Sequence, residues 1–140
     1  MSQSFYKFYY HIIFGTKYRE PIITPTIEKL LKKYIPRKIK EKEGLAIELN
    51  MVEDHLHLLA SIPPKVSVSE FIHKIKGSSS HFINVNFDKQ FFYWQAGYGA
   101  LTLSEKGIPF VRQYIANQKQ RHARNDLLNI LEYIPEDNGK

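Results

Sequence analysis

The segment LAIELNMVEDHLHLLASIPP, residues 45–64, constrains the fold more than any other part of the sequence. It contains two runs of strand-forming residues that are separated by a short polar stretch, and it ends in a double proline. Two strands joined by a tight turn pair antiparallel, and side chains alternate between the two faces of each strand. The second run therefore predicts a strand with His55, His57 and Leu59 on one face and apolar residues on the other.

Hydrophobic periodicity along the rest of the chain extends this hairpin to a β-α-β-β-α-β-α order. The expected elements are a strand over Phe5–Thr16, a helix over Thr26–Glu43 that Pro36 kinks or ends, a helix over Val68–Asn84, two short strands around Gly97 and Gly99, and a helix from Pro109 to His122. This order predicts an α+β fold: a ferredoxin-like antiparallel sheet with helices packed on one face, plus a further C-terminal helix.

Length and composition fit a single domain over residues 1–140, with a polar and less ordered tail at about 124–140. The chain has no cysteine, which excludes disulfide bonds and thiolate metal sites. The N-terminal segment lacks the features of a signal peptide, and no run approaches the ~18 apolar residues of a membrane span. These features predict a cytoplasmic protein without a membrane partner.

The chain carries 20 Lys and Arg against 14 Asp and Glu, a formal net charge of +6. A basic domain attracts anionic partners, and nucleic acid is the leading one because binding releases counterions. Charge alone leaves this open, since many basic proteins bind no polyanion.

The two histidines of the strand have two interpretations. Two imidazoles on one face of a rigid strand can hold a metal ion, or they are ordinary polar residues of a solvated sheet face. On the last predicted helix, Tyr114 and Gln118 share a face, and His122 lies one turn further. Gln118 can supply an oxygen ligand, and Tyr114 a nucleophile that a bound metal ion would assist. Alternatively, neither residue has a chemical role: Tyr114 packs in the core, and Gln118 lies on a solvated helix face.

The whole chain resembles the small single-tyrosine (Y1) transposases of the IS200/IS605 type, which belong to the His-hydrophobe-His (HUH) endonuclease superfamily. Five stretches match in order between about Phe5 and His122: "HIIFGTKYREPIIT" resembles the first strand and basic turn, "MVEDHLHLLASIPP" the HUH strand, "SVSEFIHKIKGSSSHF" the central helix, "WQAGYGALTLS" the late strands, and "VRQYIANQKQRH" the helix with the nucleophilic tyrosine. An isolated HLH would be a weak signal, whereas five segments in register are a strong one.

The resemblance implies an enzyme that cleaves single-stranded DNA beside hairpin ends. By position, Tyr114 is the nucleophile that gives a 5′-phosphotyrosine and a free 3′-OH, and strand transfer follows. His55, His57 and Gln118 correspond to the ligands of Mg²⁺ or Mn²⁺. The family also implies a homodimer in which the tyrosine helix of one subunit completes the site of the other. His122 could also reach the metal ion if the helix docks beside the histidine strand, but Arg121 stands beside it where related helices often carry two histidines, which leaves its role open.

DNA contacts are expected from basic and hydroxyl side chains close to the matched segments: Lys17, Arg19, Lys74, Lys76, Ser78 and Arg112. A turn at Gly77–Ser80 would offer backbone N–H groups to phosphate oxygens. Tyr18, Tyr98 and Trp94 are candidates for stacking on unpaired bases.

Three functions fit the sequence. The first is an active transposase, and the second is a domesticated relative that processes repeat hairpins. The third is a nonenzymatic module that binds single-stranded nucleic acid on a ferredoxin-like sheet. Retention of His55, His57, Tyr114 and Gln118 together favours an enzyme.

Overall fold

The structure is a computed structural model that describes residues 6–135. Four strands form one antiparallel sheet in the order β2-β3-β1-β4. The strands are β1 Tyr9–Gly15, β2 Leu45–Val52, β3 His55–Ser61 and β4 Gly99–Leu103. With one helix between β1 and β2 and another between β3 and β4, this order is the predicted ferredoxin-like arrangement.

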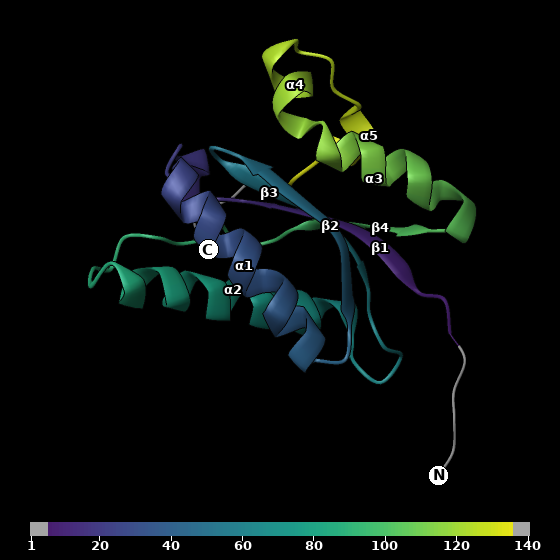
Figure 1. The fold of residues 1–140 in the computed structure, drawn as a ribbon, viewed down its shortest axis with the longest axis horizontal. Coiled ribbons are helices and arrows are strands. Elements are labelled where there is room, and N and C mark those ends of the chain that lie inside the picture. Colours follow the sequence, from purple (N-terminus) through teal and green to yellow (C-terminus); the bar gives the residue numbers. More distant parts are fainter. Residues whose placement is uncertain (1–5, 136–140) are drawn as a thin grey trace.

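Two long helices, α1 (Pro25–Glu41) and α2 (Val68–Asn86), lie side by side on one face of the sheet (Figure 1). Both begin where the sequence provides a cap. The hydroxyl of Thr24 accepts from the N–H of Ile27, and that of Ser67 accepts from the N–H of Glu70. Their apolar stripes bury the side of β3 that carries Leu56, Leu58 and Ala60, together with Ile12 and Phe14 of β1. This is the main hydrophobic core.

Three shorter helices lie on the opposite side of the sheet, as Figure 1 shows: α3 Ile108–Ala116, α4 Gln118–Ala123 and α5 Asn129–Glu132. Single turns of 3₁₀ helix occur at Lys17–Arg19 and Glu105–Gly107. The apolar contact on this side is small and centres on Leu59, Val111 and Ile115. The same face also carries the polar side chains of His11, His55 and His57.

Two expected boundaries differ from the structure in the first half of the chain. Strand β1 begins at Tyr9 and not near Phe5, which lies outside the described residues. The first helix, expected over Thr26–Glu43 with a kink or an end at Pro36, runs over Pro25–Glu41 with Pro36 inside it. The carbonyl that Pro36 leaves without an N–H donor belongs to Lys32, which is exposed, so water can satisfy it while Ile39 remains packed in the core.

Two expectations in the second half are wrong. Only one of the two strands predicted around Gly97 forms, since Trp94 makes just an isolated bridge to Thr16. The helix predicted over 109–122 breaks at Asn117 into α3 and α4. The predicted loose tail contains α5, and residues 136–140 lie outside the described part. Among residues 6–135, no helix is both long and apolar enough to cross a bilayer.

Candidate metal and tyrosine site

The antiparallel register places the histidines on the sheet face that meets α3 and α4. His57 on β3 lies opposite Asn50 on β2 and Ile13 on β1, and His55 lies opposite Gly15. Both imidazoles are buried. His11 of β1, on the same face, lies with Nε2 2.9 Å from Nδ1 of His57. The alternation predicted for β3 is confirmed, and its polar side is a buried site.

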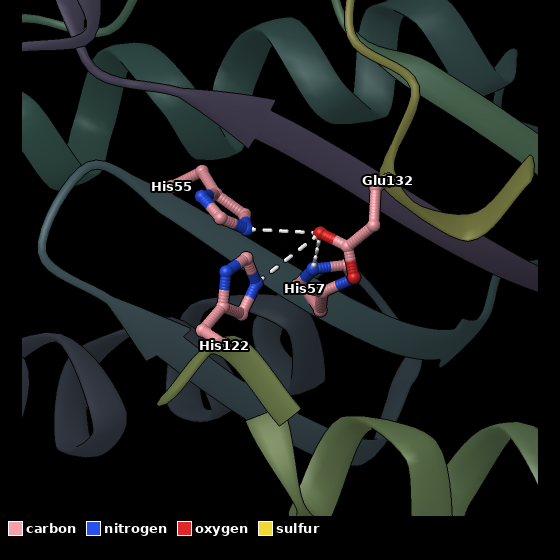
Figure 2. A group of neighbouring side chains, drawn as sticks. All are labelled: His55, His57, His122 and Glu132. Carbon is pink, nitrogen blue, oxygen red and sulfur yellow. Dashed lines mark hydrogen bonds and ion pairs between the residues drawn. The ribbon is translucent and has the colours of Figure 1, made fainter. Parts of the chain in front are cut away.

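A carboxylate from the C-terminal part of the chain lies at the centre of this site. Oε1 of Glu132, on α5, is 3.2 Å from Nε2 of His55, 3.2 Å from Nε2 of His57 and 3.3 Å from Nε2 of His122 (Figure 2). One ligand atom from each of the four residues lies within 4.8 Å of every other. The described residues therefore contain a group of three imidazoles and one carboxylate that can hold a metal ion.

Tyr114 reaches the same carboxylate from α3. Its side chain is fully buried, and its hydroxyl donates to Oε2 of Glu132 while accepting from the N–H of Leu128 at 3.1 Å. The guanidinium of Arg121 lies 4.5 Å from the centre of the Tyr114 ring. The fold thus brings Tyr114 beside the histidines of the same chain.

Gln118 is buried next to this cluster. Its Oε1 is 2.9 Å from Nε2 of His122, and its Nε2 is 3.4 Å from Oε2 of Glu132. Gln118 and His122 lie on α4, after the break in the predicted helix, yet both stay with Tyr114. His122, whose role the sequence left open, points into the group in Figure 2.

Asn50 explains where the helix breaks. Its Nδ2 donates to the carbonyls of Ile115 and Ala116 at 3.0 and 3.1 Å, which are among the last carbonyls of α3. Its Oδ1 accepts from Lys119 at 3.0 Å. A strand residue directly opposite His57 therefore fixes both the end of α3 and the start of α4 relative to the histidines.

The Nδ1 atom of each strand histidine also has a polar partner. Nδ1 of His55 lies 2.8 Å from Oδ1 of Asp54, and Asp54 also forms an ion pair with Arg19 at 3.3 Å. Nδ1 of His57 is engaged by His11. Metal-binding histidines commonly have such partners on the far nitrogen, because these fix the tautomer and the orientation of the ring. In both residues Nε2 faces Glu132.

Burial and neighbouring charges shift the pKa values in the site. Burial lowers the pKa of His11 to about 3, and His57 adds to that shift, so His11 is neutral. Burial raises the pKa of the Tyr114 hydroxyl to about 12, and its hydrogen bond to Glu132 acts in the same direction. Burial opposes the charge on Glu132, but hydrogen bonds from His55 and His57 outweigh it and hold its pKa below the usual range.

Two residues of the site, Glu132 and His11, were absent from the sequence prediction. Glu132 lies in a polar tail with no periodic pattern, and its contacts arise only from tertiary packing. His11 stands in the first predicted strand at an inward position, and the pairing of β1 with β3 that brings it to His57 is not a local feature of the sequence. Both residues are of types that bind metal ions, but nothing in the sequence distinguishes them from the other His and Glu residues of the chain.

The residues expected to contact DNA do not form one group. Arg19 pairs with Asp54 and lies 3.1 Å from Nδ1 of His55, so it belongs to the site. Lys17 and Lys76 line a separate cavity of about 460 Å³ that also includes Trp94. Arg112 pairs with Glu48 on β2. The remaining two lie on α2: Lys74, which is exposed, and Ser78.

The turn expected at Gly77–Ser80 is wrong. These residues lie inside α2, and the hydroxyls of Ser78, Ser79 and Ser80 bond to carbonyls of their own helix three residues earlier. Their backbone N–H groups belong to the helix and do not form an anion-binding loop. Of the aromatic candidates for stacking, Tyr18 is 66% exposed and Trp94 is 9% exposed, so Tyr18 alone of these two presents its ring to solvent.

A cavity of about 630 Å³ opens beside the site. Arg19, His55, Lys119 and His122 contribute to its wall. It therefore joins solvent to the edge of the histidine group, and its wall contains both cationic side chains and the carboxylates of Glu28, Glu53 and Asp54.

Comparison with known proteins identifies the family. The family model described as "Transposase IS200 like" matches residues 4–118. The chain is 31% identical over 127 residues to the transposase for insertion sequence element IS200 of Salmonella typhimurium, covering 86% of this chain and 83% of that protein. It is 29% identical over 123 residues to the ISDra2 transposase TnpA of Deinococcus radiodurans, covering 83% of this chain and 87% of that protein.

Solved structures agree with the sequence matches. A crystal structure of a candidate transposase from Deinococcus radiodurans R1 aligns with a TM-score of 0.66 at 25% identity, over 84% of this chain and 96% of that one. A REP-associated tyrosine transposase bound to a REP hairpin has the same fold, with a TM-score of 0.63 at 16% identity over 87% of this chain and 74% of that one. The chain belongs to the IS200-like family of single-tyrosine transposases.

Proposed function

We propose that this transposase cleaves single-stranded DNA through Tyr114 and rejoins the ends by strand transfer. The observation that carries the proposal is the meeting of Tyr114, His55 and His57 at one carboxylate, although they come from separate elements. A purely structural tyrosine has no need of a cluster of imidazoles beside its hydroxyl. The bordering cavity gives a path from solvent to this cluster.

In the proposed reaction, Oη of Tyr114 attacks the scissile phosphorus. A bond from Oη to phosphorus forms as the phenolic proton is lost to solvent, the bond from phosphorus to the 3′ oxygen breaks, and the 3′ oxygen takes up a proton from solvent to give a free hydroxyl. The product is a 5′-phosphotyrosine, which conserves the energy of the phosphodiester for later attack by another 3′-OH. Because burial holds the pKa of Tyr114 near 12, this attack requires assistance at neutral pH.

We propose a divalent ion, Mg²⁺ or Mn²⁺, bound by His55, His57 and Gln118. The chemistry of the histidines fits this role, because Nδ1 of each is engaged and Nε2 faces inward. A bound ion would make the phosphorus more electrophilic and stabilise charge on the phosphate oxygens. Gln118 would bind through Oε1, which must then turn away from His122.

The DNA substrate is proposed to be single-stranded with hairpin ends, since a protein of the same fold holds a hairpin. Lys17, Lys76, Arg19, Lys74, Ser78 and Arg112 are the proposed DNA contacts. We place this activity in the cytoplasm and assign it to one domain spanning the chain.

Cleavage of labelled single-stranded DNA from the sequences flanking the gene tests the proposal, with and without Mg²⁺ or Mn²⁺. We expect metal-dependent cleavage that Tyr114→Phe abolishes and that Tyr133→Phe, a change at an exposed tyrosine, leaves intact. DNA carrying dispersed repeat hairpins in place of the flanks distinguishes a domesticated relative. Binding without cleavage under every metal condition would favour the nonenzymatic module.

We also propose a homodimer in which tyrosine helices can be exchanged between subunits. Each site would contain one Tyr114 and one His57 whether the tyrosine helix belongs to the same subunit or to the other one. Mixing Tyr114→Phe protein with His57→Ala protein tests this, because exchange restores one complete site per mixed dimer. No recovery of cleavage in the mixture would show that each chain uses its own tyrosine.

A further inference from the structure

Glu132 lies outside the part of the chain that the family model matches, which ends at residue 118. Even so, its carboxylate contacts three histidines and the proposed nucleophile. We infer that Glu132 binds the same divalent ion as His55 and His57 through Oε1, while its Oε2 positions the Tyr114 hydroxyl. This inference rests on the proposed metal site and adds a ligand supplied by the C-terminal segment.

The separations between Glu132 and the three histidines are close to those of ligands around one ion. Ligand atoms about 2.0–2.1 Å from an ion are roughly 2.9 Å apart in an octahedral arrangement and roughly 3.3 Å apart in a tetrahedral one. Oε1 of Glu132 lies 3.2–3.3 Å from the Nε2 atoms of His55, His57 and His122. These separations are longer than the ~2.9 Å typical of an N–H to oxygen hydrogen bond, and a single carboxylate oxygen has only two lone pairs for three donors.

The orientation of the His55 ring leaves Nε2 for this role. Nδ1 of His55 lies 2.8 Å from Oδ1 of Asp54, a carboxylate that can only accept, and Nε2 faces Oε1 of Glu132. Nε2 is therefore the His55 atom that can bind an ion shared with Glu132 once it is deprotonated.

Hydrogen bonds hold the C-terminal segment Leu128–Pro135 against the rest of the fold on both sides of Glu132. The N–H of Leu128 donates to the Tyr114 hydroxyl, and Nε2 of Gln95 donates to the carbonyl of Pro135 at 2.8 Å. Gly99 on β4 allows this passage, since a Cβ added there would lie 2.5 Å from the carbonyl oxygen of Tyr133. Glu132 is therefore held in the site by contacts that do not involve its own side chain.

The test is Mn²⁺ binding to the full-length protein, measured by the loss of the free-Mn²⁺ electron paramagnetic resonance signal. We expect Glu132→Gln to weaken Mn²⁺ binding at least tenfold, because the amide replaces a charged ligand. Glu53→Gln is the matched control: it removes an exposed carboxylate two residues before His55 and should change the affinity less than twofold. Unaltered or tighter binding by Glu132→Gln would overturn the inference and indicate that Glu132 occupies the place of the ion.

A second measurement on the wild-type protein avoids any effect of substitution on folding. With ¹³C at the carboxyl carbons of glutamate, electron–nuclear double resonance of bound Mn²⁺ should show a strong ¹³C coupling, and its absence would overturn the inference. Failure of the proposed function gives a different result. A His55→Ala, His57→Ala double variant that binds Mn²⁺ as wild type does would refute the proposed metal site itself and, with it, this added ligand.

Discussion

Replacing Asn50 by leucine tests how a strand residue positions the tyrosine helix. The change keeps the approximate size of a buried side chain and removes four hydrogen bonds, to Ile115, Ala116, Met51 and Lys119. A net hydrogen bond contributes about 1 kcal/mol, and a buried polar group left without a partner costs roughly 1–3 kcal/mol. Since Lys119 can turn to water, we expect the free energy of unfolding to fall by roughly 2–4 kcal/mol.

For a chain of this length, such a loss lowers the melting temperature by roughly 10 °C. Thermal and urea unfolding followed by circular dichroism measure it. The matched control is Asn84→Leu, because Asn84 is an equally buried amide on α2 that bonds to the backbone of Phe91 and Phe92, away from the tyrosine helix. Both variants should lose similar stability.

The two variants should differ in DNA cleavage, measured at a temperature where both are folded. Asn50→Leu should reduce the rate of adduct formation by at least tenfold, because α3 and α4 lose the contact that places Tyr114 and Gln118 against the histidines. Asn84→Leu should keep a rate close to wild type. Equal rates for the two variants, or a loss of stability below about 0.5 kcal/mol for Asn50→Leu, would show that Asn50 does not position the tyrosine helix.

Three further outcomes follow from the structure. Gly99→Ala should weaken Mn²⁺ binding by displacing Tyr133. The control is Gly77→Ala, because a Cβ added at Gly77 meets nothing within 4 Å. It should leave Mn²⁺ binding unchanged and stabilise α2 by about 0.5–1 kcal/mol. Mn²⁺ should bind more tightly than Mg²⁺ in a competition titration, because imidazole nitrogen is a poor ligand for Mg²⁺. Burial raises the pKa of Glu28, but hydrogen bonds from Lys119 and Lys32 outweigh it and lower the pKa. The stability that Glu28 adds is therefore present above its unfolded pKa and lost as pH falls, so the difference in melting temperature between wild type and Glu28→Gln should shrink as pH drops from 6 to 3.

The sequence was sufficient to predict the sheet and the two strand histidines, because alternation along β3 is a local property. His55 and His57 fall on the face opposite Leu56 and Leu58 whatever the rest of the chain does. The helical spacing of Tyr114 from its neighbours was likewise visible.

What escaped prediction depends on contacts between distant segments. The break at Asn117 follows from the side chain of Asn50 on β2, not from a breaker within the helix. Glu132 enters the site because Gly99 lets the C-terminal segment lie close to β4. Neither relation leaves a periodic signal in the sequence, so the sequence predicts a continuous helix and a less ordered tail.

The most direct test of the account is to identify the residue that carries the DNA. The protein is incubated with Mn²⁺ and cleavable single-stranded DNA, digested with protease and nuclease, and analysed by mass spectrometry. We predict a nucleotide 5′-phosphate on the peptide containing Tyr114, with no adduct in Tyr114→Phe. An adduct on another residue, or cleavage by Tyr114→Phe at the wild-type rate, would contradict it.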